Sequence, residues 1–175
     1  GEGIEQIGVG FLAGLSDFRA EVFSLMEHAW VLFRDHGRFP STISLPRLRP
    51  ATGVDLTAIE GDFVSDEDFK KILTVLRIAL PASGIVLTTR ERGEFRDELL
   101  RLGIGVTHLS AGVSTDIGGY ANPDEEEGEG QFHLSDHRSL DAMTAVLGRL
   151  GYQSVMGWGG PGLLSAAIDP VRECP

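Results

Sequence analysis

An arginine that follows an apolar segment is the residue of this sequence best suited to bind a small anion. Arg90 comes after the apolar run 85–87, which places it at the end of an expected strand rather than on a solvated helix. A guanidinium in that position can hold a carboxylate with two parallel hydrogen bonds. The local alternative is an ion pair between Arg90 and either Glu91 or Asp97.

Small and polar residues also follow the first apolar segment of the chain. Gly10 and Gly14 lack side chains, so the backbone there could approach a flat ligand closely. Ser16 and Asp17 come next and could bind the same ligand. The alternative is that these two residues cap the helix that follows.

Two further segment ends carry polar groups. Arg47 and Arg49 are two positions apart in an extended segment, so their side chains should point the same way. One of them could reach an anionic group, or each could form a surface salt bridge. Ser110 and Ser114 follow the fourth apolar run and could be hydrogen-bonding ligands or turn residues.

A pair of histidines has the spacing of a metal or catalytic site at first sight. His133 and His137 are four positions apart, but Asp136 and Ser139 beside them indicate turn and cap chemistry. The acidic run 124–129 is typical of a solvated loop. We therefore expect no metal ligands in this part of the chain.

The hydrophobic pattern predicts four successive strand–helix units that would position these residues. In the expected helices, apolar residues recur at steps of three and four positions. The expected strands span 4–15, 42–48, 85–89 and 106–110, and the expected helices span 17–35, 65–80, 93–102 and 140–150. A further strand could span 152–158, and we expect the tail 159–175 to be flexible.

Alternating strands and helices predict an α/β fold with a parallel sheet and right-handed crossovers. Four such units form either half of an eight-stranded barrel or a small open doubly wound sheet. In both architectures, ligands bind beyond the carboxyl ends of the strands. The polar segment ends should therefore meet at one edge of the sheet.

Composition excludes several classes of function. The net charge of −11 disfavours binding to nucleic acids and to anionic membrane surfaces. No apolar run approaches the roughly 20 residues of a membrane-spanning helix, and the first ten residues show no signal peptide. The single cysteine, Cys174, allows no disulfide within the chain, which favours a cytoplasmic location, and one thiolate cannot build a cluster site.

Longer motifs give the chain a family resemblance over roughly residues 4–150. The stretches are IGVGFLAGLSDFRAEVFSLMEHA, STISLPRLRPATG, VSDEDFKKILTVLRIALP, GIVLTTRERGEFRDELLRLGI, LSAGVSTDIGGY and QFHLSDHRSLDAM. They resemble the radical S-adenosylmethionine (radical SAM) lyases of aromatic amino acids, and among them the tyrosine lyases. The branch that matures [FeFe]-hydrogenase is the most similar, and the branch of thiazole synthesis for thiamine is a relative.

The resemblance implies a fold and a site. Family members are (β/α)8 barrels, so residues 1–151 would be the second half of a barrel, with its strands five to eight, and residues 152–175 an extension. The resemblance implies that Arg90 holds the amino acid carboxylate, with Thr88 and Ser110 in the substrate pocket. Val113 stands where the family has a serine, and an insertion lies around 105–107.

The resemblance also implies cofactors. The family uses SAM and a [4Fe–4S] cluster to cleave tyrosine into p-cresol and dehydroglycine. The resemblance implies that the segment with Gly10, Gly14, Ser16 and Asp17 binds the SAM adenosine, and we add the two arginines Arg47 and Arg49 to this prediction. The cysteine motif for the cluster belongs to the first half of the family barrel and is absent from this sequence.

Three hypotheses for function follow. The chain could be the substrate-binding half of a tyrosine lyase that pairs with a first half of the barrel. It could be a half-barrel without a cluster that acts as a binding or assembly module and associates with itself or with another chain. Without the resemblance, it would be an open α/β sheet that binds a small anion. In each case the expected small-molecule ligand lies at the carboxyl ends of the strands.

Overall fold

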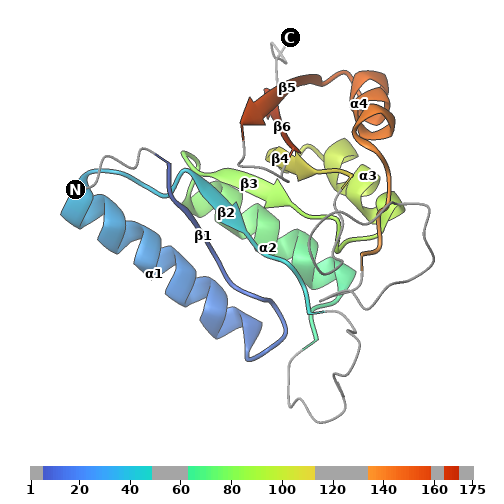
Figure 1. Cartoon of the computed structure of the whole chain (residues 1–175). Helices are drawn as coiled ribbons and strands as arrows, with labels where there is room; N and C mark the ends of the chain where they lie inside the picture. The colour runs from blue at the N-terminus through green and yellow to red at the C-terminus, as the bar shows by residue number, and fades with distance from the viewer. Residues whose placement is uncertain (1–5, 49–62, 113–133, 159–163, 170–175) are drawn as a thin grey trace, which may run out of the picture.

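The computed structural model describes residues 6–48, 63–112, 134–158 and 164–169. Strands and helices alternate along the chain until the last helix, after which two strands follow (Figure 1). The strands are β1 (Gly8–Gly10), β2 (Thr42–Ser44), β3 (Gly84–Leu87), β4 (Val106–Ser110), β5 (Gln153–Trp158) and β6 (Leu164–Asp169). The helices are α1 (Phe18–His36), α2 (Asp66–Ala79), α3 (Gly93–Arg101) and α4 (Leu140–Arg149).

The sheet confirms the predicted parallel arrangement. Its strand order is β1-β2-β3-β4-β6-β5, and β1 to β4 pair in parallel in the order of the chain. The α/β fold with four successive strands and connecting helices is therefore confirmed. The irregular register opposite Ile85 and Val86 falls where the sequence has its predicted insertion, since Val106 and His108 pair there and Thr107 lies between them.

Part of the expected C-terminal extension belongs to the sheet. Residues 164–169 form β6, which pairs antiparallel with both β4 and β5. Pairing satisfies backbone donors and acceptors that an edge strand leaves open, and this favours an ordered hairpin beside β4. β6 thus pairs along the side of β4 that faces away from β3, and the outer strands of the described sheet are β1 and β5.

The first two strands are shorter than predicted because their pairing is interrupted. β1 ends at Gly10, and parallel pairing resumes as an isolated bridge between Ala13 and Arg47. The backbone at Gly14 then has a φ of 112°, which favours glycine. Within the predicted spans, only Gly8–Gly10 and Thr42–Ser44 are hydrogen-bonded as strands.

Local sequence signals define the helix ends. Ser65 caps α2 by accepting a hydrogen bond from the Asp68 backbone, and Ser139 caps α4 in the same way through Ala142. α1 ends at Gly37 with a φ of 69°, which is the usual geometry of a glycine that stops a helix. The cap at Ser139 was expected from its residue type, and Ser65 and Gly37 follow the same local rules.

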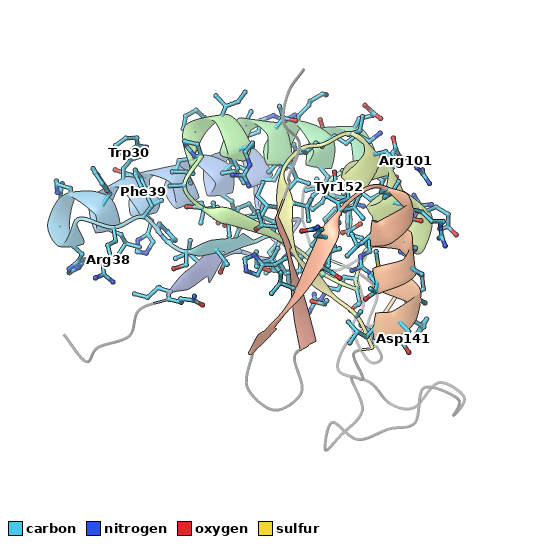
Figure 2. The ribbon with its side chains drawn as sticks, turned by 90° about the horizontal axis from the view of Figure 1, so that it is seen from above. Trp30, Arg38, Phe39, Arg101, Asp141 and Tyr152 are labelled. Atoms are coloured by element: carbon cyan, nitrogen blue, oxygen red, sulfur yellow. The ribbon has the colours of Figure 1, made fainter. Side chains whose placement is uncertain are left out.

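The two faces of the sheet differ in chemistry. Ile43, Ile85, Leu87 and Leu109 are buried and belong to one core cluster with apolar residues of the helices. Figure 2 shows α1 and α2 side by side along that face of the strands. Strand alternation places a second set of residues on the opposite face, and the register aligns one row of them across four strands: Gly10, Ser44, Val86 and His108. This second face is made of small and polar residues.

Candidate functional site

The candidate site lies just beyond β3 and β4. A turn of four residues follows β3, and we call Thr88–Glu91 the β3 turn. The Glu91 N–H donates to the Thr88 carbonyl at 3.5 Å. The Thr89 carbonyl accepts hydrogen bonds from the backbone N–H groups of Ser135 (3.0 Å) and Asp136 (3.1 Å). The turn is thus bonded to a segment more than 40 residues further along the chain, at the carboxyl end of the sheet.

Arg90 lies in this turn and is half-buried. Burial lowers the pKa of Arg90 below the ordinary arginine value. Arg90 has an interaction of its own within the chain. Of the two carboxylates considered as its partners, Glu91 binds Arg47 and Asp97 binds Arg138. Its predicted role in holding a carboxylate stays a prediction.

Thr88 and Ser110 each come directly after the last residue pair between β3 and β4. The last pair between β3 and β4 is Leu87 with Leu109, so these two residues are the next position of each strand. Within the described part of the chain, the Thr88 hydroxyl is buried and has no hydrogen-bond partner. A buried polar atom without a partner is unfavourable unless something else binds it. The hydroxyl is therefore available to a ligand at this edge.

Arg47 occupies a different environment from the one expected. Its side chain is only 4% exposed and forms two hydrogen bonds with the Glu91 carboxylate, one of them Nε to Oε1 at 2.9 Å. It also donates to Asp66 Oδ1 at 2.8 Å and packs beside the rings of Phe69 and Phe95. Burial alone would lower the pKa of Arg47, but the Glu91 carboxylate outweighs it and the pKa is raised.

Arg47 therefore faces the helix-covered side of the sheet, where it anchors the β3 turn through Glu91. Arg49, predicted to point the same way, lies outside the described residues. Sequence reasoning missed the buried carboxylate of Glu91. An alternation signal was present, because Leu87, Thr89 and Glu91 share one phase of the strand with the buried Ile85.

The residues after β1 have partners within the chain. A Cβ atom at Gly10 would collide with the carbonyl oxygen of Ser44 on the neighbouring strand. The Ser16 hydroxyl donates to Glu21 at 2.6 Å, and Asp17 caps α1 by accepting from the Arg19 N–H at 2.9 Å. The capping alternative is thus observed for Asp17, and the predicted role of these residues in binding SAM stays a prediction.

A second buried ion pair joins α3 to the segment before α4. Arg96 and Asp136 are 0% and 4% exposed, and Arg96 Nη1 donates to the Asp136 carboxylate. Arg96 Nη2 donates to the Ser110 carbonyl at 2.6 Å. Arg138 donates to Asp136 from Nη2 at 2.6 Å and to Asp97 from Nη1 at 2.8 Å.

The turn chemistry expected of Asp136 is present, since its carboxylate accepts from the Arg138 N–H at 3.1 Å, but its pairing with Arg96 was not foreseen. Arg96 occurs three and four positions before Leu99 and Leu100, on the buried stripe of α3. That spacing was the available signal. His137 is exposed, and His133 lies outside the described residues.

His108 is a further polar group, which the sequence analysis did not single out. It lies on the face of the sheet opposite the one covered by α1 and α2. It follows the irregular register of β4, and its Nδ1 lies 2.8 Å from the Thr107 hydroxyl. Burial lowers the pKa of His108 below the ordinary value of 6.5. The imidazole is therefore mostly neutral at pH 7. His108 lies two residues before Ser110 on the same strand.

Comparisons with known proteins identify the family. The model of the Biotin and Thiamin Synthesis associated domain matches residues 44–153, which is more than half of the chain. The chain belongs to this family. It corresponds to the C-terminal part of the radical SAM tyrosine lyases, as the sequence motifs predicted.

Curated relatives of this radical SAM lyase segment include two 2-iminoacetate synthases. The protein of Escherichia coli (strain K12) is 36% identical over 156 residues, which cover 87% of this chain and 39% of the relative. The protein of Salmonella typhimurium (strain LT2) is 35% identical over 155 residues, with the same coverage of 87% and 39%. The chain thus spans about two-fifths of the length of these relatives.

Solved structures similar to the lyase segment are maturases of [FeFe]-hydrogenase. HydG, a maturase of the [FeFe]-hydrogenase, has a TM-score of 0.72 and 38% identity, covering 84% of this chain and 31% of its own. The maturase HydG from Carboxydothermus hydrogenoformans has a TM-score of 0.69 and 41% identity, covering 85% and 32%. These neighbours are radical SAM barrels of the TIM type, and this chain matches their C-terminal part.

The family uses SAM and a [4Fe–4S] cluster, and the two differ in their fit to this segment. Among the residues the structure describes, no group of three His, Cys, Asp or Glu side chains could hold a metal ion, so these residues do not fit the cluster. For an organic ligand, the observation within the described residues is the buried Thr88 hydroxyl, which has no hydrogen-bond partner. In the same described residues, no helix is long and apolar enough to cross a membrane.

Proposed function

We propose that this chain supplies the substrate-binding part of a radical SAM tyrosine lyase. The observation that carries the proposal is the buried, unpartnered hydroxyl of Thr88, which, like Ser110, comes directly after the last residue pair between β3 and β4 and lies just before Arg90 at the carboxyl end of the sheet. Ligands of α/β barrels bind at this end. The match to 2-iminoacetate synthases over 87% of the chain gives the family context.

The three residues have complementary roles toward an amino acid. The Arg90 guanidinium binds the carboxylate of L-tyrosine with two parallel hydrogen bonds. The hydroxyls of Thr88 and Ser110 bind the remaining carboxylate oxygen or the amino group. Such fixed placement converts a loosely bound substrate into one whose Cα–Cβ bond is held in a reactive position.

SAM and the cluster, when bound by the complete enzyme, supply the radical chemistry that cleaves tyrosine into p-cresol and dehydroglycine. The residues of this chain orient the amino acid and exclude water around it. The lysine- and arginine-poor, acidic surface of the chain keeps nucleic acids away from the site. We place the protein in the cytoplasm on the basis of its single cysteine.

Within the lyases, we assign the chain to the branch that matures [FeFe]-hydrogenase. Its identity to the two HydG chains is 38% and 41%, against 36% and 35% for the 2-iminoacetate synthases. The thiamine branch is the alternative. The chain would be combined with a cysteine-bearing first half of a barrel, and release of cyanide and CO in addition to p-cresol would support the maturase branch. Formation of p-cresol alone would support the thiamine branch.

A second candidate function is that of a binding or assembly module without radical chemistry. Both candidates expect no cluster ligands in this segment, so they differ in whether radical chemistry follows tyrosine binding. Tyrosine binding with no p-cresol release, from the chain alone and with a candidate first half, would support this alternative over the lyase.

Replacement of Arg90 tests the site directly. We expect Arg90→Ala to weaken L-tyrosine binding by about tenfold to a hundredfold, because hydrogen bonds to charged groups contribute about 1.5–3 kcal/mol. Isothermal titration calorimetry or ligand-detected NMR measures the affinity. Arg101→Ala is the matched control, because Arg101 is exposed in the last turn of α3. An Arg90→Ala protein that binds tyrosine as the wild type does would contradict the proposal.

A further inference from the structure

We propose that Arg96 and Asp136 are positioning residues that hold the β3 turn and the end of β4 at a fixed separation. The proposal rests on the proposed function, because the β3 turn carries Thr88 and Arg90 and the end of β4 is Ser110. The pair would set the distance between these three ligand-binding groups without touching the ligand itself.

The pair forms a continuous link between the two strand ends. At one end, the Asp136 N–H donates to the Thr89 carbonyl of the β3 turn at 3.1 Å. In the middle, the Asp136 carboxylate accepts from Arg96 Nη1. At the other end, Arg96 Nη2 donates to the Ser110 carbonyl at 2.6 Å. The backbone groups of two predicted ligand-binding segments are therefore connected through one ion pair.

The sheet itself does not provide this connection. The register between β3 and β4 is defined up to the pair Leu87 and Leu109. Ser110 pairs instead with Ser165 of β6 on its other side. Beyond the last pair, Asp136 and Arg96 link the Thr89 carbonyl of the β3 turn to the Ser110 carbonyl itself. A backbone bond from Gly112 N–H to the Arg138 carbonyl connects the same segment to the residues after Ser110.

The Asp136 carboxylate is charged and binds two arginines. Burial alone would raise the pKa of Asp136, but the hydrogen bonds from Arg138 and the charge of Arg96 outweigh it, so the pKa is lowered. The carboxylate is therefore ionised at neutral pH and bonded to both arginines. Arg138 also accepts the Gly112 N–H at its carbonyl, at 3.1 Å, which attaches the same segment to the residues after β4.

A buried ion pair is a poor means of gaining stability alone, because desolvation of both charges offsets their attraction. Its advantage is geometry, since a guanidinium presents several donors in a rigid plane. Arg96 uses two of them on two different segments. One side chain therefore fixes two segments relative to each other, which an ion pair between two surface side chains would not do.

The test is a double-mutant cycle on tyrosine affinity. Asp136→Asn keeps the size of the side chain but removes its charge and so weakens the link to Arg96. We expect about a tenfold loss of tyrosine affinity with the fold retained by circular dichroism. Thr88→Val, which removes the unpartnered hydroxyl, should then have a smaller effect in the Asp136→Asn background than in the wild type. Arg96→Lys should behave as Asp136→Asn does, because an ammonium cannot reach both partners in one plane.

Asp141→Asn is the matched control for the loss of one carboxylate. Asp141 is exposed in the first turn of α4 (Figure 2), and its replacement should leave tyrosine affinity unchanged. Strictly additive effects of Thr88→Val and Asp136→Asn on tyrosine affinity would overturn the positioning role. They would mean that the ion pair affects binding independently of the Thr88 hydroxyl.

A separate measurement distinguishes this proposal from the proposed function. If the wild type does not bind tyrosine, the proposed function fails, and hydrogen exchange then decides the positioning role alone. We expect the amides of Ser135 and Asp136 to exchange at least about tenfold faster in Asp136→Asn, since both donate to Thr89. Unchanged exchange at these two amides would overturn the proposal.

Discussion

At the scale of single residues, the β3 turn depends on a buried arginine and a buried glutamate. Arg47 and Glu91 are 4% and 1% exposed, and the carboxylate binds two guanidinium nitrogens. The removal of one partner from such a pair leaves the other charge buried and poorly compensated. Glu91 directly follows Arg90, so the pair also fixes the backbone next to the predicted carboxylate-binding residue.

We expect Glu91→Ala to lower the free energy of unfolding by about 3 kcal/mol, the lower end of the range for a broken buried pair. The loss stays at that end because Arg47 keeps its hydrogen bonds to Asp66 and to the Val64 carbonyl. Urea unfolding followed by circular dichroism measures the change. Asp35→Ala, which removes the exposed partner of Arg34, is the control and should not alter stability measurably. Equal effects of the two substitutions would contradict the importance of burial here.

At the scale of elements, capped helices connect the strands and place their ends. Asp17, Ser65 and Ser139 each accept a backbone hydrogen bond at the start of a helix. For Asp17 the cap competes with the predicted role in SAM binding, because the same carboxylate would serve both. The two roles respond differently to a change of charge.

If Asp17 acts as a cap, Asp17→Ala should lower the free energy of unfolding by about 1 kcal/mol, while Asp17→Asn should be nearly neutral because asparagine caps as well as aspartate. Thermal and urea unfolding of the two variants measure the difference. In the complete enzyme, a large loss of SAM affinity in Asp17→Asn with unchanged stability would instead support the role in SAM binding.

At the scale of the whole molecule, the described sheet ends in β1 on one side and in β5 on the other. β6 lies between β4 and β5, and β1 is the outer strand beside β2 (Figure 1). Ile7, beside β1, is 49% exposed. Edge strands with apolar neighbours favour association through strand pairing. We therefore propose that β1 pairs with a first half of a barrel or with a second copy of this chain.

Charge at this edge should prevent the association. Ile7→Lys should convert the chain from an oligomer to a species near the monomer mass of 18.9 kDa, because a lysine opposes edge-to-edge pairing. Size-exclusion chromatography with light scattering measures the mass. Ile78→Lys is the matched control, since Ile78 is 76% exposed on α2, away from the edge. A wild-type chain that is monomeric alone and with a first half would contradict the proposal.

The sequence by itself determined the local structure of this protein. The apolar steps of the helices, the cap at Ser139, and the strand Val106–Ser110 were predicted from residues near one another in the chain. Periodicity and capping depend on neighbours within a few positions, so they can be read without a fold. The family motifs added the barrel half, which the comparisons confirmed.

Only the tertiary structure decided which charges pair. Arg47 with Glu91 and Arg96 with Asp136 are 44 and 40 positions apart, and no local rule selects one carboxylate among the many in an acidic chain. The pairing of β6 with β4 is of the same kind, because it brings together segments on either side of α4. Long-range contacts depend on where the sheet places each strand end, and that placement follows from the packing of the whole fold.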